Sequence, residues 1–493
     1  MVVATVRAGE ARVPWPVPLV AGGALLSFRL WRLGAAPFVY DEPIFLDAAR
    51  SQLDGHWLTA SPVTGTRGVP YGPSVFWLYG SLQWLVGQRP LLAIAAMCVL
   101  TTAAQVLLVA GLTRLARGGP ALFLLLLLLV GSSPYLHLWS RVAWDQTVLI
   151  CAPAAVGVLC WPSTIGVRHA VIVGLLMGLA LSSHPMSVPF VAAVLGVVGW
   201  ELRQQPSRAG RVGGAMVGSA LLVNLPYLHH LATERSRGVA QPPLSEGLFD
   251  RLLQAPSVMS SARVEYLLDG GTDRLVDSTA GVGAALELRG VVLLVLIAGS
   301  IVGLVASWRD PDRRRRRIAR CGGVTWILSV VCLALARVGL EPHYQFATWW
   351  VIPAGIALAV RPIRAVSSAR VVAATGAAAV VGLNLLFVVS WTSFLSADGG
   401  TRGIRYGASL DNQQQAVERL CRGPESELAV VNETQVFQES LDYLISTTPA
   451  CEGRDLRICA DPCREASSWV RLRLAYAPDG SAELVVLDER SGS

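Results

Sequence analysis

Long apolar runs alternate with short, arginine-rich polar segments along most of this chain. Eleven runs are apolar and long enough to cross about 30 Å of hydrocarbon, which nominally takes about 20 helical residues, although bundles tolerate shorter helices. We predict helices at residues 14–33, 90–113, 119–134, 145–161, 168–183, 187–201, 212–231, 288–307, 321–338, 344–360 and 370–392. The pattern therefore predicts a mainly α fold, a polytopic transmembrane helical bundle of about 11 spans.

Arginine residues indicate the orientation of the bundle, since cytoplasmic loops collect basic residues. With the N-terminus inside, the basic loops near residues 114–117, 168, 203–211, 309–320 and 361–370 are all cytoplasmic. The first run is expected to stay as an anchor because no small-residue cleavage site follows it. We therefore expect a multi-pass protein of the cell membrane.

One further apolar run, 72–87, would reverse this orientation if it crossed the membrane. We predict instead that it lies in or partly in the outer interface, where Trp77, Tyr79 and Trp84 suit an aromatic belt. The segments 34–89, 135–144, 184–186, 232–287 and the tail from about 393 then lie outside.

The tail differs in character from the rest of the chain. Helical patterns in DNQQQAVERLCR and ESLDYLIS alternate with strand patterns in ELAVV, WVRLRLAYA and AELVVLDE. We predict two domains. Residues 1–392 form the transmembrane domain, with outer loops 34–89 (carrying interfacial helices) and 232–287, and residues 393–493 form a small extracytoplasmic α/β domain.

Composition supports a membrane protein and excludes other classes. The chain is 53% hydrophobic and only 15% charged, whereas about 25% charged is usual in soluble domains. All 41 basic residues are arginine, which with the abundant Ala, Gly and Val is typical of a GC-rich bacterial genome. The densest basic cluster, Arg313 to Arg317, lies between two apolar runs, so we expect membrane lipid and no nucleic acid as a partner.

Four of the nine cysteines lie in the tail, at Cys421, Cys451, Cys459 and Cys463. Four cysteines in such a segment suggest two disulfides in an oxidising compartment, with three pairings open. The absence of a C-x-x-C pair argues against zinc.

Ionisable residues at the membrane edge are costly and are therefore functional candidates. In the predicted topology they gather on the outer side. They are Asp41, Glu42, His56, Arg67, Arg141, Asp145, His184, Glu341 and His343, with Tyr344 beside the last.

The order of these features resembles the GT-C superfamily of integral membrane glycosyltransferases, which contains protein O-mannosyltransferases and lipid A aminoarabinose transferases. The shared features are an Asp-Glu pair after the first helix, a glycine-rich loop with a proline turn, SSPYLHLWSRVAWD, and EPHYQFATWWVIP. The resemblance covers about residues 14–392. The chain departs from it at Pro70-Tyr71-Gly72-Pro73, where a paired proline is frequent, and at His343-Tyr344, where an Arg-Tyr pair is frequent.

The resemblance implies an inverting transfer of a sugar from a polyprenyl-phosphate donor to an acceptor hydroxyl at the outer face of the membrane. Asp41 would be the general base, and Glu42 would orient it or bind the acceptor. The expected donor phosphate and sugar ligands are Arg67, Arg141, Asp145, His184, His343 and Tyr344. Asp145, four residues after Arg141, could pair with it on one helix face or contact the sugar. A glycan, a lipid or a protein could supply the acceptor.

The same residues also suit other functions. Asp41, Glu42, Asp145, His184 and His343 could converge on a divalent metal, but no compact ligand spacing indicates one, so no metal is assigned. The alternative function is a lipid or polysaccharide transporter or flippase. Its charges would be expected near the midplane of the bilayer and not gathered at one face.

The topology can be tested by labelling with a membrane-impermeant thiol reagent. We expect cysteines introduced at Arg89 and Gly399 to react in intact cells, and a cysteine at Gly322 to react only after the membrane is opened. The reason is that the arginine loops are cytoplasmic and 72–87 does not span. Reaction within 313–317 from outside intact cells would reverse the orientation.

Overall fold

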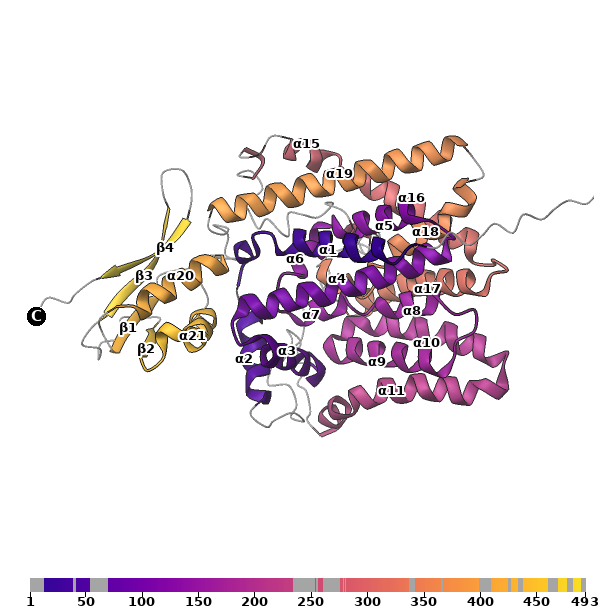
Figure 1. Ribbon diagram of the computed structural model, residues 1–493. Helices are drawn as coiled ribbons and strands as arrows, with labels where there is room; N and C mark the ends of the chain where they lie inside the picture. The colour runs from indigo at the N-terminus through magenta and orange to yellow at the C-terminus, as the bar shows by residue number, and fades with distance from the viewer. Residues whose placement is uncertain are drawn as a thin grey trace, which may run out of the picture.

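The protein is described here from a computed structural model. It describes residues 13–38, 41–53, 70–233, 253, 256–259, 275–277, 279, 281–336, 342–364, 367–398, 409–423, 427–432, 438–459, 469–476 and 482–488. Most of the chain forms a bundle of roughly parallel helices, and the C-terminal strands lie beyond one end of it (Figure 1).

All eleven predicted apolar runs are helical. Within the described residues, six helical segments are long and apolar enough to cross a membrane, and five apolar ones are shorter. The long ones lie in α4 (Pro90–Leu115), η2 with α10 (Pro185–Ser187, Val188–Arg203), α11 (Pro206–Thr233), α16 (Arg289–Ser307), α17 (Arg313–Ala336) and α19 (Ser367–Asp398). The shorter ones are α1 (Pro16–Leu30), α5 (Pro120–Gly131), α7 with α8 (Asp145–Leu149, Ala154–Cys160), α9 (Val167–Ser183) and α18 (Val351–Arg364). The chain is a mainly helical, polytopic integral membrane protein.

Three predicted spans are interrupted or shifted. The run 145–161 is two helices, because Pro153 lacks an N–H and cannot continue the helix before it. After α5, Pro134 begins the separate helix α6 (Pro134–Trp139). The run predicted at 344–360 starts later, since η3 (Pro342–Gln345) and a turn precede α18 at Val351.

Apolar side chains on the outer helices face away from the protein. Leu222 on α11 is 69% exposed, Val305 on α16 is 69% exposed and Leu335 on α17 is 78% exposed. Such surfaces are suited to lipid tails, since large contiguous apolar patches are rare on soluble monomers. Inside the bundle, helices approach closely at small residues: a Cβ on Gly303 of α16 would lie 1.8 Å from the Gly355 carbonyl oxygen of α18.

The two ends of the bundle differ. α2 (Asp41–Leu53) and α3 (Pro73–Val86) lie at the end nearest the C-terminal strands (Figure 1). We call this the site end and the opposite end, which carries Arg313 to Arg317 at the start of α17, the arginine end. α3 has 14 residues and is therefore about 21 Å long, less than the hydrocarbon thickness. The location of residues 72–87 in the outer membrane–water interface stays a prediction.

The tail contains the predicted helices and strands, and one more strand. Its elements are α20 (Leu410–Cys421), β1 (Glu427–Asn432), α21 (Gln438–Thr447), η4 (Pro449–Cys451), β2 (Asp455–Cys459), β3 (Trp469–Tyr476) and β4 (Ala482–Asp488). The strands form one sheet in the order β2-β1-β3-β4. β1 pairs in parallel with β2 and β3, and β3 and β4 pair antiparallel. The strand β2 was missed. The domain boundary at 393 stays a prediction.

The helices of the tail are hydrogen-bonded to the segment between α1 and α2. The backbone N–H of Leu410 donates to the Ala36 carbonyl at 2.9 Å. The carbonyl of Phe38 accepts from Gln413 Nε2 at 2.9 Å and from Ser440 Oγ at 3.0 Å. These bonds fix the chain three residues before Asp41.

One disulfide joins Cys421 at the end of α20 to Cys451 in η4, across 30 residues of sequence. One of the two predicted bridges is therefore confirmed. The partners expected for the other, Cys459 and Cys463, have side chains outside the described residues.

We expect Cys421→Ser/Cys451→Ser to loosen α20 and α21. Removing a native disulfide typically costs about 2–5 kcal/mol, so amide hydrogen exchange in these helices should rise while α4 keeps its protection. Cys332→Ser, at a free and partly buried cysteine in α17, is the matched control. Unchanged exchange in α20 and α21 would show that their contacts with the bundle suffice without the bridge.

Candidate functional site

The acidic pair opens α2 at the site end of the bundle. Asp41 is partly buried, whereas Glu42 is only 3% exposed. Glu42 Oε1 accepts a hydrogen bond from the backbone N–H of Ala143 at 3.1 Å. The Glu42 side chain therefore links α2 to the loop between α6 and α7. Asp41 is the less buried carboxylate of the pair.

That loop carries Trp144 and ends at Asp145, the first residue of α7. Thr147 Oγ1 donates to the carbonyls of Trp139 and Val142 at 2.9 and 3.0 Å. The hydroxyl of Tyr79, from α3, donates to the Trp144 carbonyl at 2.8 Å. The Trp144 indole N–H lies near the Asp41 carboxylate but outside normal hydrogen-bond geometry.

Asp145 is fully buried, and neither of its carboxylate oxygens accepts a hydrogen bond of normal geometry from a described residue. Among the described basic groups, His184 Nε2 lies nearby, 3.9 Å from Oδ2, which is too far for a direct hydrogen bond. Buried polar atoms are nearly always satisfied, so such a carboxylate calls for an explanation. A ligand with donor groups would supply one.

His184 follows α9, and its Nδ1 accepts from the Met186 backbone N–H at 3.1 Å. Burial, and to a lesser extent the nearby His343, lowers the pKa of His184 to about 3. His184 is thus neutral at physiological pH, and because Nδ1 is an acceptor, Nε2 carries the proton. This N–H is on the side of Asp145.

The turn at Pro70 to Pro73 is pressed against the end of α9. The N–H of Gly72 donates to the Ser182 carbonyl at 2.7 Å, and a Cβ at Gly72 would lie 2.1 Å from Ser182 Oγ. Glycine is therefore required there. The close approach places the Tyr71 ring 6.2 Å from that of His184.

His343 and Tyr344 in η3 complete the cluster. Their rings are 4.4 Å apart, and the Tyr344 ring is stacked on that of His184 at 5.8 Å. The His343 ring lies 5.7 Å from that of Trp144. Five predicted site residues thus meet at the site end: Asp41, Asp145, His184, His343 and Tyr344.

Burial raises the pKa of the Asp41 carboxyl above its usual range, partly opposed by the Trp144 indole and then by His343. Burial raises the pKa of Tyr71 above its usual value, and the nearby carboxylates of Asp145 and Asp41 raise it further. The phenol therefore stays protonated and can donate a hydrogen bond into the cluster.

Arg141 is not part of this cluster. Its guanidinium donates to the carbonyls of Trp31 and Arg32 and lies 2.9 Å from His137 Nε2. The prediction that it pairs with Asp145 on one helix face is wrong, because α6 ends at Trp139 and α7 starts at Asp145. Arg141 instead fixes the chain just after α1. Burial lowers its pKa to about 10, so it remains charged.

Three predicted candidates, His56, Arg67 and Glu341, lie outside the described residues. Within the described part of the chain, no group of three or more His, Cys, Asp or Glu side chains is arranged to hold a metal ion.

Two residues beside the cluster were missed as candidates. Tyr71 lies in the Pro70-to-Pro73 turn, which was noted as a departure from the family pattern, and Trp144 directly precedes Asp145. Both could have been found from the sequence, because each is next to a candidate residue or motif. Neither side chain is charged at neutral pH, whereas nearly all of the selected candidates were acidic or basic residues.

Comparisons with known proteins identify the fold. The apo structure of ArnT from Cupriavidus metallidurans matches with a TM-score of 0.53 and 14% identity, over 90% of this chain and 86% of that one. ArnT from the same organism bound to undecaprenyl phosphate matches with a TM-score of 0.42 and 13% identity, over 90% and 86%. An oligosaccharyltransferase from Archaeoglobus fulgidus, in complex with zinc and sulfate, gives 0.47 and 12%, and this chain spans 62% of its length.

No protein-family profile and no curated protein sequence matches the chain. The match to the apo ArnT structure confirms the resemblance to GT-C glycosyltransferases at the level of the fold.

The unsatisfied carboxylate of Asp145 gives a testable prediction. We expect Asp145→Asn to raise the free energy of unfolding by about 1–3 kcal/mol, because a buried charge without partners carries an uncompensated desolvation cost. Thermal unfolding of the purified protein measures this. The control is Asp47→Asn, since Asp47 forms only an exposed ion pair with Arg50. A loss of stability in Asp145→Asn larger than in the control would mean that the charge has a structural partner.

Proposed function

We propose that the protein is a membrane glycosyltransferase that moves a sugar, with inversion, from a polyprenyl-phosphate donor to an acceptor hydroxyl at the outer face of the membrane. The observation that carries the proposal is the convergence of Asp41, Asp145, His184, His343 and Tyr344 at one end of a bundle with the GT-C fold. ArnT, whose apo form shares this fold, has also been crystallised with undecaprenyl phosphate.

The chemistry needs one base for the acceptor hydroxyl, because polyprenyl phosphate is a good leaving group and requires no strong general acid. We assign the base to Asp41. Its raised pKa lies closer to neutrality than that of an exposed carboxylate, and a base works best when its pKa approaches the operating pH. Glu42 supports it by holding the Ala143 backbone.

The other members of the cluster suit the donor. Asp145, whose two oxygens accept no hydrogen bond of normal geometry from a described residue, is proposed to bind sugar hydroxyls. His343, Tyr344 and neutral His184 are proposed as hydrogen-bond donors to the sugar or its phosphate. Since Arg141 is occupied by the carbonyls after α1, we propose Arg67, the other arginine predicted to bind the phosphate, as the cation for the departing group.

The outer location is supported by two independent features. Arg313 to Arg317 lie at the arginine end, and basic loops favour the cytoplasmic side. The disulfide between Cys421 and Cys451 is close to the site end, and disulfides persist in oxidising compartments. We therefore propose an extracytoplasmic tail and a cytoplasmic N-terminus. The acceptor hydroxyl would belong to a glycan, a lipid or a protein.

The decisive variant is Asp41→Asn, which keeps the size of the side chain and removes its basicity. We expect turnover to fall by about 10² to 10⁴ with donor binding largely kept. The folded state should be stabilised at neutral pH, because a carboxyl with a raised pKa opposes folding once it ionises. Sugar transfer from a synthetic polyprenyl-phosphate donor and thermal unfolding provide the two readouts.

Glu42→Gln is the comparison, since glutamine keeps an oxygen that can accept from Ala143, and it should lose less turnover than Asp41→Asn. The reverse order would move the base to Glu42. If Asp41→Asn transferred sugar at the wild-type rate, the assignment would be ruled out. Loss of lipid translocation in vesicles with intact transfer would favour the alternative function, a transporter or flippase.

A further inference from the structure

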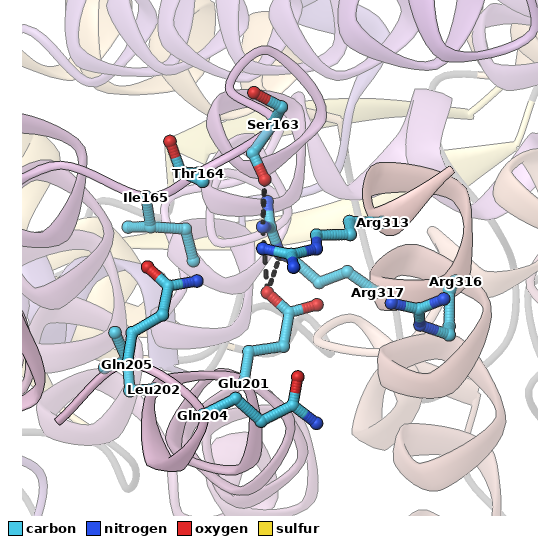
Figure 2. Close-up of a pocket in the computed structure, with 10 residues that line it drawn as sticks. All are labelled: Ser163, Thr164, Ile165, Glu201, Leu202, Gln204, Gln205, Arg313, Arg316 and Arg317. Carbon is cyan, nitrogen blue, oxygen red and sulfur yellow. Dashed lines mark hydrogen bonds and ion pairs between the residues drawn. The ribbon is translucent and has the colours of Figure 1, made fainter. Parts of the chain in front are cut away.

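A pocket lies at the arginine end of the bundle, where three segments meet. They are the loop between α8 and α9 with Ser163 and Thr164, the end of α10 with Gln204 and Gln205 following it, and the start of α17 with its arginines (Figure 2). It is an open hollow of about 390 Å³, a volume that includes adjoining solvent. α9 has 17 residues between this loop and His184, so the pocket is about 26 Å from the cluster at the site end.

Arg317 forms the fixed wall of the pocket. Its Nε and Nη2 lie 2.9 and 2.8 Å from Glu201 Oε2. Its Nη1 donates to the carbonyls of Leu159 and Pro162, and Nη2 to that of Ser163, all at 3.1 Å. Figure 2 shows the Arg317 guanidinium between Glu201 and Ser163. Arg317 is therefore a structural residue, and it neutralises the only acidic group lining the pocket.

Two other arginines in the lining keep their charge uncompensated. Among the described residues, neither Arg313 nor Arg316 forms an ion pair, and Arg316 donates only to the Asp310 carbonyl, at 2.9 Å. The start of α17 is already capped by Asp312, whose Oδ1 accepts from the Arg314 N–H. Among the described residues, the pocket lining thus contains two guanidinium groups without a carboxylate partner, of which Arg316 also donates to a backbone carbonyl.

Uncharged donors lie beside these arginines. Gln205 Oε1 accepts from Arg208 at 3.2 Å, which leaves the Gln205 amide nitrogen as a donor facing the lining. Thr164 is an exposed residue of the lining. Arginine pairs combined with neutral donors are the groups that bind phosphate oxygens in proteins.

Tryptophans show the depth of the pocket in the membrane. Trp161, Trp200 and Trp308 are 45%, 55% and 37% exposed, and each is at the arginine end of its apolar helix, a few residues from the lining. Tryptophan favours the level of the lipid headgroups. The pocket is therefore at the depth where a headgroup phosphate is found, at the edge of the apolar helices α10 and α17.

We propose that this pocket binds the phosphate of an anionic phospholipid through Arg313 and Arg316. Basic pockets between transmembrane helices are a known way to recognise such headgroups. The site is separate from the proposed transferase site and does not depend on it.

The test uses the purified full-length protein, delipidated in detergent, with phosphatidylglycerol or phosphatidylcholine added and binding read by native mass spectrometry. We expect phosphatidylglycerol to bind more tightly than phosphatidylcholine. Arg313→Gln/Arg316→Gln should weaken phosphatidylglycerol binding about tenfold or more, since each lost charge-assisted contact is worth roughly tenfold in affinity. The matched control is Arg168→Gln/Arg309→Gln, which removes two exposed charges at the same end outside the lining.

Equal phosphatidylglycerol binding by wild type and both double variants would overturn the proposal and leave the arginines as orientation signals only. Displacement of the lipid by equimolar inorganic phosphate would assign the pocket to a soluble anion and overturn it as well. The single variant Arg313→Gln tests the proposal if the double variant misfolds. It is expected to fold, because this exposed side chain has no partner in the described part of the chain. It should still weaken binding severalfold, and unchanged binding would count against the proposal.

Discussion

Irregular backbone buried at the end of an apolar bundle must have its N–H and C=O groups satisfied, because lipid offers no hydrogen bonds. The polar side chains of the site end largely serve this need. Glu42 accepts from Ala143 N–H, Tyr79 donates to the Trp144 carbonyl, and Arg141 donates to the carbonyls after α1. Once these roles are assigned, Asp41 and Asp145 remain as carboxylates that accept no backbone hydrogen bond of normal geometry from a described residue.

This constraint explains which parts of the architecture could be predicted from the sequence. Each of the eleven apolar runs could be predicted to be helical, because insertion into lipid depends on the composition of a whole segment. The breaks at Pro134 and Pro153 were overlooked because the flanking residues are apolar on both sides. The error at Arg141 followed directly, as an i,i+4 pairing needs a continuous helix.

The candidate site was predictable in part for a similar reason. Charged residues at a membrane edge are rare enough to stand out, so Asp41, Asp145, His184 and His343 could be found before their contacts were known. Tyr71 carries no charge, and its place beside His184 depends on Gly72 packing against Ser182, 110 residues later in the sequence. Contacts of this kind have no local signature.

The attachment of α20 and α21 to Phe38 affects the timing of assembly. The bond from Gln413 to the Phe38 carbonyl spans 375 residues of sequence. At about 5–20 residues per second, the ribosome needs roughly 20–75 s to make the chain between these two positions. The segment leading into the acidic pair must wait that long for its last hydrogen-bond donors. A nascent chain already inserted in the membrane therefore holds Asp41 without this support until its C-terminal part has been made and delivered to the site end.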